Sequence, residues 1–193
     1  MVSSKRKSLG VGPEEKVIVL ASRYTGIRET HKASGPAFPG LLAAIGARLG
    51  ARLIVKPHPA EPRDAYDLDI AAAKLGDRVR VVAEQSLTDI LPAADLLITV
   101  ESLSATEALV AGVPVVILRH PSNLRDLVTS GAALGVPDGA DPGPTIELLL
   151  TNAEAREGWR RSREAYLIDV AHGVDGKALD RLLALVSKMA ALD

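Results

Sequence analysis

Short apolar runs alternate along most of the chain with segments in which apolar residues recur every three or four positions. The runs are rich in Val, Ile and Leu, as buried parallel strands are. They are Val17–Leu20, Leu53–Val55, Val79–Val82, Leu96–Val100 and Val115–Leu118. The intervening segments have the spacing of helices that pack on a sheet. This alternation predicts an α/β fold: a single Rossmann-like, doubly wound parallel sheet of five to six strands, with helices on both faces.

The pattern also divides the chain. Residues 1–13 are basic and serine-rich and have no apolar period, which predicts a flexible leader or linker before one folded domain at 14–193. Residues 131–144 are rich in Gly and Pro and predict a surface loop. Thr151, with a Glu three residues later, has the spacing of a capping box before a charged helix. A last helix with one apolar side is predicted at about 177–191.

Composition narrows the class of protein. Hydrophobic residues make up 47 % of the 193 residues and aromatic residues only 3 %, so Val, Leu, Ile and Ala must build the core. The formal net charge of −1 argues against a nucleic-acid partner. The chain has no cysteine, which excludes disulfides and thiolate metal sites and suits a reducing compartment. Because no apolar run reaches the roughly 20 residues of a membrane span, we expect a cytoplasmic protein without one.

Polar side chains follow the predicted strands where each one ends. In an open parallel sheet, ligands bind outside the carboxyl ends of the strands, where the strand order reverses. The residues that follow the strands are Ser22 and Arg23, Lys56 and His58, Gln85, Ser102 and Ser104, and Arg119 and His120. The turns before the strands carry mostly ordinary Gly, Ala, Arg and Asp. The asymmetry predicts a binding site at the carboxyl edge.

The segment after the fourth strand is the most informative. Ser102, Ser104 and Thr106 lie where a strand leads into a helix, followed by Glu107. Backbone N–H groups at a helix start, together with the positive end of the helix dipole, favour an anion, and hydroxyl groups add donors. This pattern predicts a phosphate site. The alternative is a capping box between Ser104 and Glu107, which needs no ligand.

The turn after the second strand, Lys56-Pro57-His58-Pro59, supplies a second candidate. Its two prolines restrict the backbone around His58, so the imidazole is held in place to neutralise a phosphate or donate a proton to a leaving group. The alternative is a histidine that only satisfies a turn. Arg119, after the fifth strand, is a further candidate for binding an anion.

The sequence predicts neither a metal site nor a cofactor. Asp67 and Asp69 have D-x-D spacing but fall in a predicted helix, where side chains two apart diverge. No Gly-rich loop with Lys-Ser/Thr is present, and no G-x-G-x-x-G follows the first strand. These absences argue against a P-loop enzyme and against NAD or FAD.

Together these motifs resemble the C-terminal, donor-binding lobe of GT-B-type glycosyltransferases. The resemblance is nearest to the CDP-glycerol/capsule polysaccharide transferases and to the non-hydrolysing UDP-N-acetylglucosamine 2-epimerases, and extends over about residues 16–186. The motifs that carry it are Lys56–Pro59, Ala94–Thr99, Ser102–Gly112, Pro114–Val116 and Asp175–Ala178. One departure is Glu101-Ser102-Leu103-Ser104, where the epimerases have Asp-Ser-Gly-Gly.

The resemblance implies roles for the candidate residues. Ser102 and Ser104 would hold the donor phosphates, and Glu107 would accept hydrogen bonds from the ribose hydroxyls. His58 would contact the phosphate of the leaving nucleotide, and Gln85 would meet the base. Arg119 is similar to an arginine common in the epimerases. Independently of the resemblance, the residues themselves suggest that Thr106 adds a hydroxyl donor and that Lys56 adds a positive charge near the phosphates.

The resemblance further implies a UDP-sugar or CDP-polyol donor, used in surface polysaccharide or glycoconjugate synthesis. Such enzymes place the acceptor site and the catalytic base on an N-terminal lobe, whereas this sequence starts at the second lobe. We therefore expect little or no activity from the isolated chain and a separate N-terminal lobe as partner. The alternatives are half of a 2-epimerase-like enzyme and a non-catalytic docking module. Self-association through the last helix is a further expectation.

Overall fold

The computed structural model describes residues 2–22, 37–48, 50–62, 64–172 and 174–190. Its centre is a six-stranded sheet in which each paired strand runs parallel to its neighbour, in the order β3-β2-β1-β4-β5-β6. The strands are β1 (Lys16–Ala21), β2 (Ala51–Lys56), β3 (Val79–Val81), β4 (Leu96–Thr99), β5 (Val115–His120) and β6 (Leu134–Pro137). This confirms the predicted Rossmann-like sheet, with β6 as a strand that the apolar runs did not reveal.

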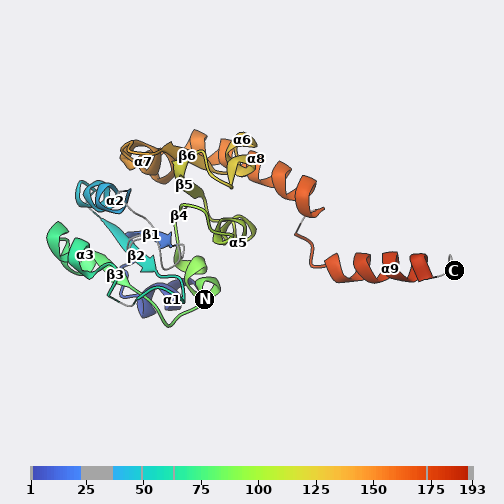
Figure 1. Ribbon diagram of the computed structural model, residues 1–193, viewed down its shortest axis with the longest axis horizontal. Helices are drawn as coiled ribbons and strands as arrows, with labels where there is room; N and C mark the ends of the chain where they lie inside the picture. The colour runs from blue at the N-terminus through green and yellow to red at the C-terminus, as the bar shows by residue number, and fades with distance from the viewer. Residues whose placement is uncertain (1, 23–36, 49, 63, 173, 191–193) are drawn as a thin grey trace.

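Helices cover both faces of the sheet (Figure 1). On one face lie α2 (Ala37–Gly46), α3 (Asp67–Ala73) and α7 (Gly143–Thr151). The other carries α1 (Val2–Ser8), α4 (Leu87–Ile90), the 3-10 turn η2 (Leu91–Ala93) and α5 (Ser104–Ala111). The remaining elements are η1 (Gly76–Arg78), α6 (Arg125–Thr129), α8 (Ala153–Ala171) and α9 (Ala178–Ala190). α8 contacts both α7 and α5, so it links the two layers.

The central strands explain the apolar runs in the sequence. Val17–Leu20 of β1 and Leu96–Ile98 of β4 have no exposed surface, because helices cover them on both sides. A strand buried on both faces needs apolar residues at consecutive positions rather than at alternate ones. The core also includes an edge-to-face contact between Phe38 and Tyr66, whose ring centroids are 4.9 Å apart. This contact joins α2 to the start of α3.

The N-terminal segment is packed against the sheet, whereas the sequence predicted a flexible leader over residues 1–13. Residues 2–8 form α1, and the exposed fractions of Leu9 and Val11 are only 1 % and 7 %. The Arg6 guanidinium donates to the Ala93 carbonyl at 3.2 Å and to the Asp95 carboxylate at 3.3 Å. These contacts join residues more than 80 positions apart, so a local pattern of apolar residues in the sequence cannot predict them.

The predicted surface loop at 131–144 instead contains β6 and leads into α7. Ala132 and Ala133 have no exposed surface, and Val136 is 3 % exposed. Close packing requires a glycine at position 135, because a Cβ added there would lie 2.8 Å from Cγ of His120. β6 is an edge strand with one strand neighbour, β5, so a short run with only a few large apolar residues suffices. Its glycine therefore marks a close contact rather than a loop.

The C-terminal helices differ in how they are held. Asn152, one residue after the predicted Thr151, caps α8, because its Oδ1 accepts from the Ala155 N–H at 2.9 Å. The indole Nε1 of Trp159 in α8 donates to the Ala132 carbonyl at 2.9 Å, which fastens this helix to the chain just before β6.

α9, by contrast, extends away from the rest of the chain and has no buried residue (Figure 1). Its large apolar side chains are more than half exposed: Leu179, Leu182, Leu183, Leu185, Val186 and Met189. Within the described ranges, none of the helices combines the length and the apolar character needed to cross a bilayer.

Candidate functional site

The strand order reverses at β1, which lies between β2 and β4. Ala21 at the end of β1 pairs in register with Lys56 of β2 and with Thr99 of β4, so the three strands end at one level. Neighbouring strands lie about 4.8 Å apart, which places the ends of β2 and β4 about 10 Å from each other. A ligand over the end of β1 is therefore flanked by the loops that follow β2 and β4.

A partly buried polar network holds the turn after β2. The Glu61 carboxylate accepts hydrogen bonds from the Ser22 hydroxyl, from the His58 backbone N–H at 2.8 Å and from the Tyr66 hydroxyl at 3.2 Å. The Ser22 hydroxyl oxygen also accepts from the His58 N–H at 2.8 Å. Ser22 is only 6 % exposed and Tyr66 has no exposed surface. The network ties the ends of β1 and β2 to the start of α3.

The same turn orients the His58 ring. Nδ1 of His58 accepts from the backbone N–H of Ala60 at 3.1 Å, so in the neutral ring the proton is on Nε2. The turn is closed by a hydrogen bond of 2.9 Å from the Glu61 N–H to the His58 carbonyl. The side chain of His58 is exposed at the carboxyl edge. The structure thus places this residue where the sequence predicts the site, with a donor nitrogen on the far side of the ring.

Lys56 and Gln85 lie beside this turn. The Lys56 ammonium donates to the Ala83 carbonyl at 2.5 Å, which holds the β3–α4 connection against the end of β2. Gln85 lies in this connection and is half-buried. An ammonium group has three donors, so this contact leaves Lys56 further hydrogen-bonding capacity. The structure therefore brings Lys56, His58 and Gln85 to one part of the carboxyl edge.

The start of α5 differs in detail from the prediction. No capping box joins Ser104 and Glu107; instead, the Ser102 hydroxyl oxygen accepts from the Ser104 N–H at 3.2 Å. The Ala105 and Thr106 N–H groups bond to carbonyls one turn back, so the first turn satisfies its own donors. Within the described residues, Oγ of Ser104 is buried and has no hydrogen-bond partner. Buried hydroxyl groups are usually paired, which makes Ser104 unusual.

Thr106 and Glu107 are exposed and line a groove of about 540 Å³ between α4–η2 and α5. Most of its walls are apolar. The residues that line it are Thr88, Leu91, Pro92, Leu103, Thr106, Glu107, Val110 and Ala111. The groove thus combines an apolar wall with the carboxylate of Glu107.

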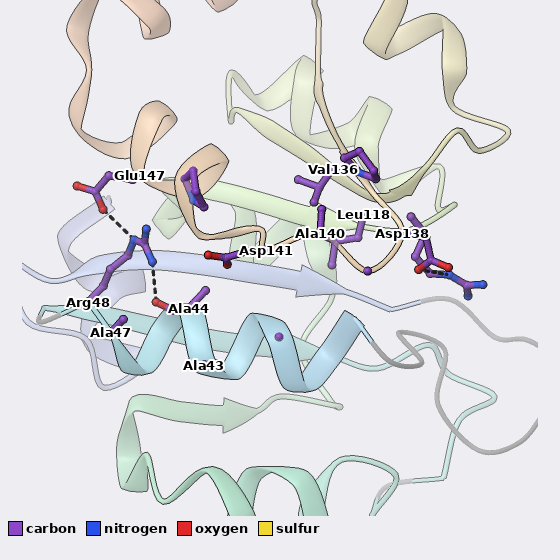
Figure 2. Close-up of a pocket in the computed structure, with 15 residues that line it drawn as sticks. Ala43, Ala44, Ala47, Arg48, Leu118, Val136, Asp138, Ala140, Asp141 and Glu147 are labelled. Carbon is purple, nitrogen blue, oxygen red and sulfur yellow. Dashed lines mark hydrogen bonds and ion pairs between the residues drawn. The ribbon is translucent and has the colours of Figure 1, made fainter.

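Arg119 lies elsewhere, in a cavity of about 640 Å³ between α2, α7 and the ends of β5 and β6 (Figure 2). Its guanidinium is 3.4 Å from the Asp138 carboxylate at one end, and Arg48 donates to Glu147 at 2.8 Å at the other. Between them the lining consists mainly of small residues. Because α2 and α5 cover opposite faces of the sheet, Arg119 is separated from Glu107, and the predicted binding residues do not form one cluster.

Sequence reasoning overlooked Glu61 and Tyr66. One signal was available: Glu61 follows His58 by three residues, the spacing at which a side chain can reach back to close a turn. Tyr66 carried no such signal, because its hydroxyl finds Glu61 only once α3 packs on the sheet. Ser22 was singled out as following the first strand, whereas its neighbour Arg23 lies outside the described residues.

Comparison with known proteins places this geometry in context. No protein-family model matches the sequence, and no curated protein matches it. Among solved structures, Anabaena HepE in complex with UDP and glucose is similar over 96 % of this chain and 52 % of its own, with a TM-score of 0.71 at 17 % identity. A putative UDP-N-acetylglucosamine 2-epimerase from Listeria monocytogenes is similar over 98 % and 48 %, with a TM-score of 0.72 at 17 % identity.

The chain thus spans about half the length of these two proteins. A third similar structure is the C-terminal domain of a glycosyl transferase group 1 family protein, LpcC, from Francisella tularensis, matched over 91 % of this chain and 94 % of that domain. Its TM-score is 0.64 at 11 % identity. The chain thus shares the fold of this C-terminal domain and of the matched halves of the other two proteins. The fold agrees with the resemblance that the motifs predict.

Proposed function

We propose that this chain binds the nucleoside diphosphate part of an activated sugar or polyol, as the donor-binding half of a two-lobed glycosyltransferase. One observation carries the proposal: the His58 turn and the start of α5 lie on either side of the strand-order reversal at β1, and the Ser104 hydroxyl in α5 is buried without a partner among the described residues. Open parallel sheets bind their ligands at this position.

The phosphates would lie between the His58 turn and α5. His58 offers an Nε2–H donor, held by the hydrogen bond at its other nitrogen. The N-terminal end of α5 adds the positive end of a helix dipole, and the hydroxyls of Ser102 and Ser104 add donors. Since the first backbone N–H groups of α5 already bond within the turn, we assign the phosphate contacts to the hydroxyls and to His58.

The nucleoside would occupy the groove between α4–η2 and α5. Apolar walls, including Leu91 and Val110, suit the faces of a base, and the Glu107 carboxylate would accept hydrogen bonds from the ribose hydroxyls. Thr106 lines the same groove, and Gln85, held nearby through the Lys56 contact with the β3–α4 connection, would meet the edge of the base. The UDP and glucose bound to the structurally similar HepE support a nucleotide sugar as the ligand class.

In transfer, the acceptor oxygen attacks the donor carbon while the bond from that carbon to the diphosphate oxygen breaks. The electron pair of this bond passes to the diphosphate, whose growing charge is stabilised by His58 and by α5. The proton of the acceptor goes to a base that we assign to the other lobe. We therefore expect the isolated chain to bind donor nucleotides and to transfer little or nothing to an acceptor. A surface polysaccharide or another glycoconjugate is the acceptor class that we propose.

Calorimetric titration of the chain with UDP, CDP, CMP and ADP tests the proposal. We expect selective binding of UDP or CDP, weakened about tenfold or more by Glu107→Ala and by His58→Ala, since each removes a hydrogen bond to or from the ligand. Glu164→Ala, an exposed glutamate of α8, is the matched control and should leave the affinity unchanged. A folded chain that binds none of the four nucleotides would overturn the proposal.

The likeness to the Listeria protein favours a second candidate, half of a 2-epimerase-like enzyme. A strict preference for UDP, with release of UDP from UDP-N-acetylglucosamine in the absence of acceptor once both halves are present, would favour it. Preference for CDP would favour polyol transfer.

The exposed apolar side chains of α9 match what a non-catalytic docking module would show, and also what a helix that pairs with another copy would show. Sedimentation of the chain over a range of concentrations tests self-association. A chain that stays monomeric throughout that range would count against pairing.

A further inference from the structure

We propose that Glu61 is a positioning residue that fixes the His58 turn and ring for phosphate binding. This inference rests on the proposed nucleotide site. Glu61 lies in the same turn as His58, and no role was predicted for it from the sequence.

The turn is closed in both directions. The Glu61 N–H donates to the His58 carbonyl at 2.9 Å, and the His58 N–H returns a hydrogen bond of 2.8 Å to the Glu61 carboxylate. Such reciprocal bonds over three residues satisfy two backbone groups at once, as in a capping box. Between them, the Ala60 N–H donates to Nδ1 of His58. The carboxylate therefore helps to hold the short loop whose backbone orients the imidazole.

The network reaches the core on its other side. The hydroxyl of Tyr66 donates to Glu61 at 3.2 Å, and the buried ring of Tyr66 packs edge-on against Phe38. Ser22, nearly buried at the end of β1, donates its hydroxyl to the same carboxylate. A chain of contacts thus leads from the core through Glu61 to the exposed His58. An exposed side chain gains a fixed orientation only through such support.

Three groups donate hydrogen bonds to the Glu61 side chain, which favours a carboxylate at this position. A carboxylate only accepts hydrogen bonds and has about four acceptor sites, whereas a glutamine amide replaces one oxygen with a donor group. Glu61→Gln keeps the shape of the side chain but removes its charge and leaves a single acceptor oxygen, so a hydroxyl of Ser22 or Tyr66 that meets the NH₂ group must turn from donating to accepting. We therefore expect the glutamine variant to fold and to loosen the His58 turn.

A double-mutant cycle on nucleotide affinity separates positioning from general structural damage. We expect Glu61→Gln to weaken the binding of UDP and CDP about five- to tenfold, by loosening His58. In a His58→Ala background the same substitution should change the affinity less than about twofold, because the group it positions is gone. Glu164→Gln on α8 is the matched control. Equal weakening in both backgrounds would overturn the proposal.

A second readout needs no nucleotide. In the wild-type chain at a pH where the ring is neutral, the ¹⁵N spectrum of His58 should show one tautomer with the proton on Nε2, and the Ala60 amide should be protected from exchange. Glu61→Gln should average the ring signals and reduce that protection. Unchanged ring signals and protection would refute the positioning role. If the wild-type chain bound no nucleotide, the proposed function would fail and this spectrum would still decide the role of Glu61.

Discussion

Leu9→Ala tests whether the N-terminal segment belongs to the folded core. The Leu9 side chain is 1 % exposed, although it lies in a stretch that the sequence alone predicts to be flexible. Truncating a leucine to alanine in a packed core lowers the free energy of unfolding by about 2–5 kcal/mol, because transfer free energy is lost and a cavity is left behind. Since Leu9 is as buried as the residues of the central strands, we expect a loss of about 3 kcal/mol in the free energy of unfolding.

Urea unfolding measures this loss. With an m-value of about 2 kcal/mol per molar urea, a loss of about 3 kcal/mol lowers the midpoint by about 1.5 M. The melting temperature should fall by about 6–12 °C for a chain of this length. Leu68→Ala is the matched control, because Leu68 is 83 % exposed on α3 and its truncation should change the free energy by less than about 0.5 kcal/mol.

If both variants unfold at the wild-type midpoint, the N-terminal segment contributes no core contacts, and the packing of α1 and Leu9 against the sheet would be refuted. A lower midpoint for Leu9→Ala with an unchanged m-value would show that the segment unfolds together with the sheet, since m reports the surface exposed on unfolding.

Further predictions concern packing and pH. In urea unfolding, Gly158→Ala in α8 should raise the free energy of unfolding by about 0.5–1 kcal/mol, because a Cβ there meets open space. Gly135→Ala should lower it by about 1–3 kcal/mol, because the added Cβ would press on His120. Hydrogen bonds from the Gly12 N–H and from Arg52 hold the pKa of Glu15 below its usual 4.5. The stabilisation that ionised Glu15 provides is therefore complete above pH 4.5 and is lost as the pH falls through the lowered pKa. Glu15→Gln should therefore flatten the loss of stability as pH falls below about 4.5, and an equally steep loss would contradict this reasoning.

The sequence alone determined the sheet and the edge at which its candidate polar residues gather. Strands such as Val17–Leu20 are buried on both faces and must be apolar throughout, which leaves a pattern that can be recognised without a structure. Parallel strands all end at one edge, so His58 and Ser104 could be assigned to the same edge from their positions after β2 and β4.

The tertiary structure decided which faces and partners these residues have. Glu107 and Arg119 both follow strands, yet they line cavities on opposite faces, because α5 lies on one side of the sheet and α2 and α7 lie on the other. The hydroxyl of Ser22 meets Glu61 across 39 positions of sequence. Such contacts depend on how helices pack over the sheet, and no local pattern encodes them.

The same reason explains why the segments at residues 1–13 and 131–144, predicted from the sequence to be a flexible leader and a surface loop, contain packed residues in the structure. Leu9 is buried as a member of the hydrophobic core, and Gly135 is required by a close approach to His120, so neither leaves a periodic signal. Local sequence specifies an element when many neighbouring residues share one environment, as in the central strands. Where a single side chain meets a partner far along the chain, only the folded arrangement determines its place.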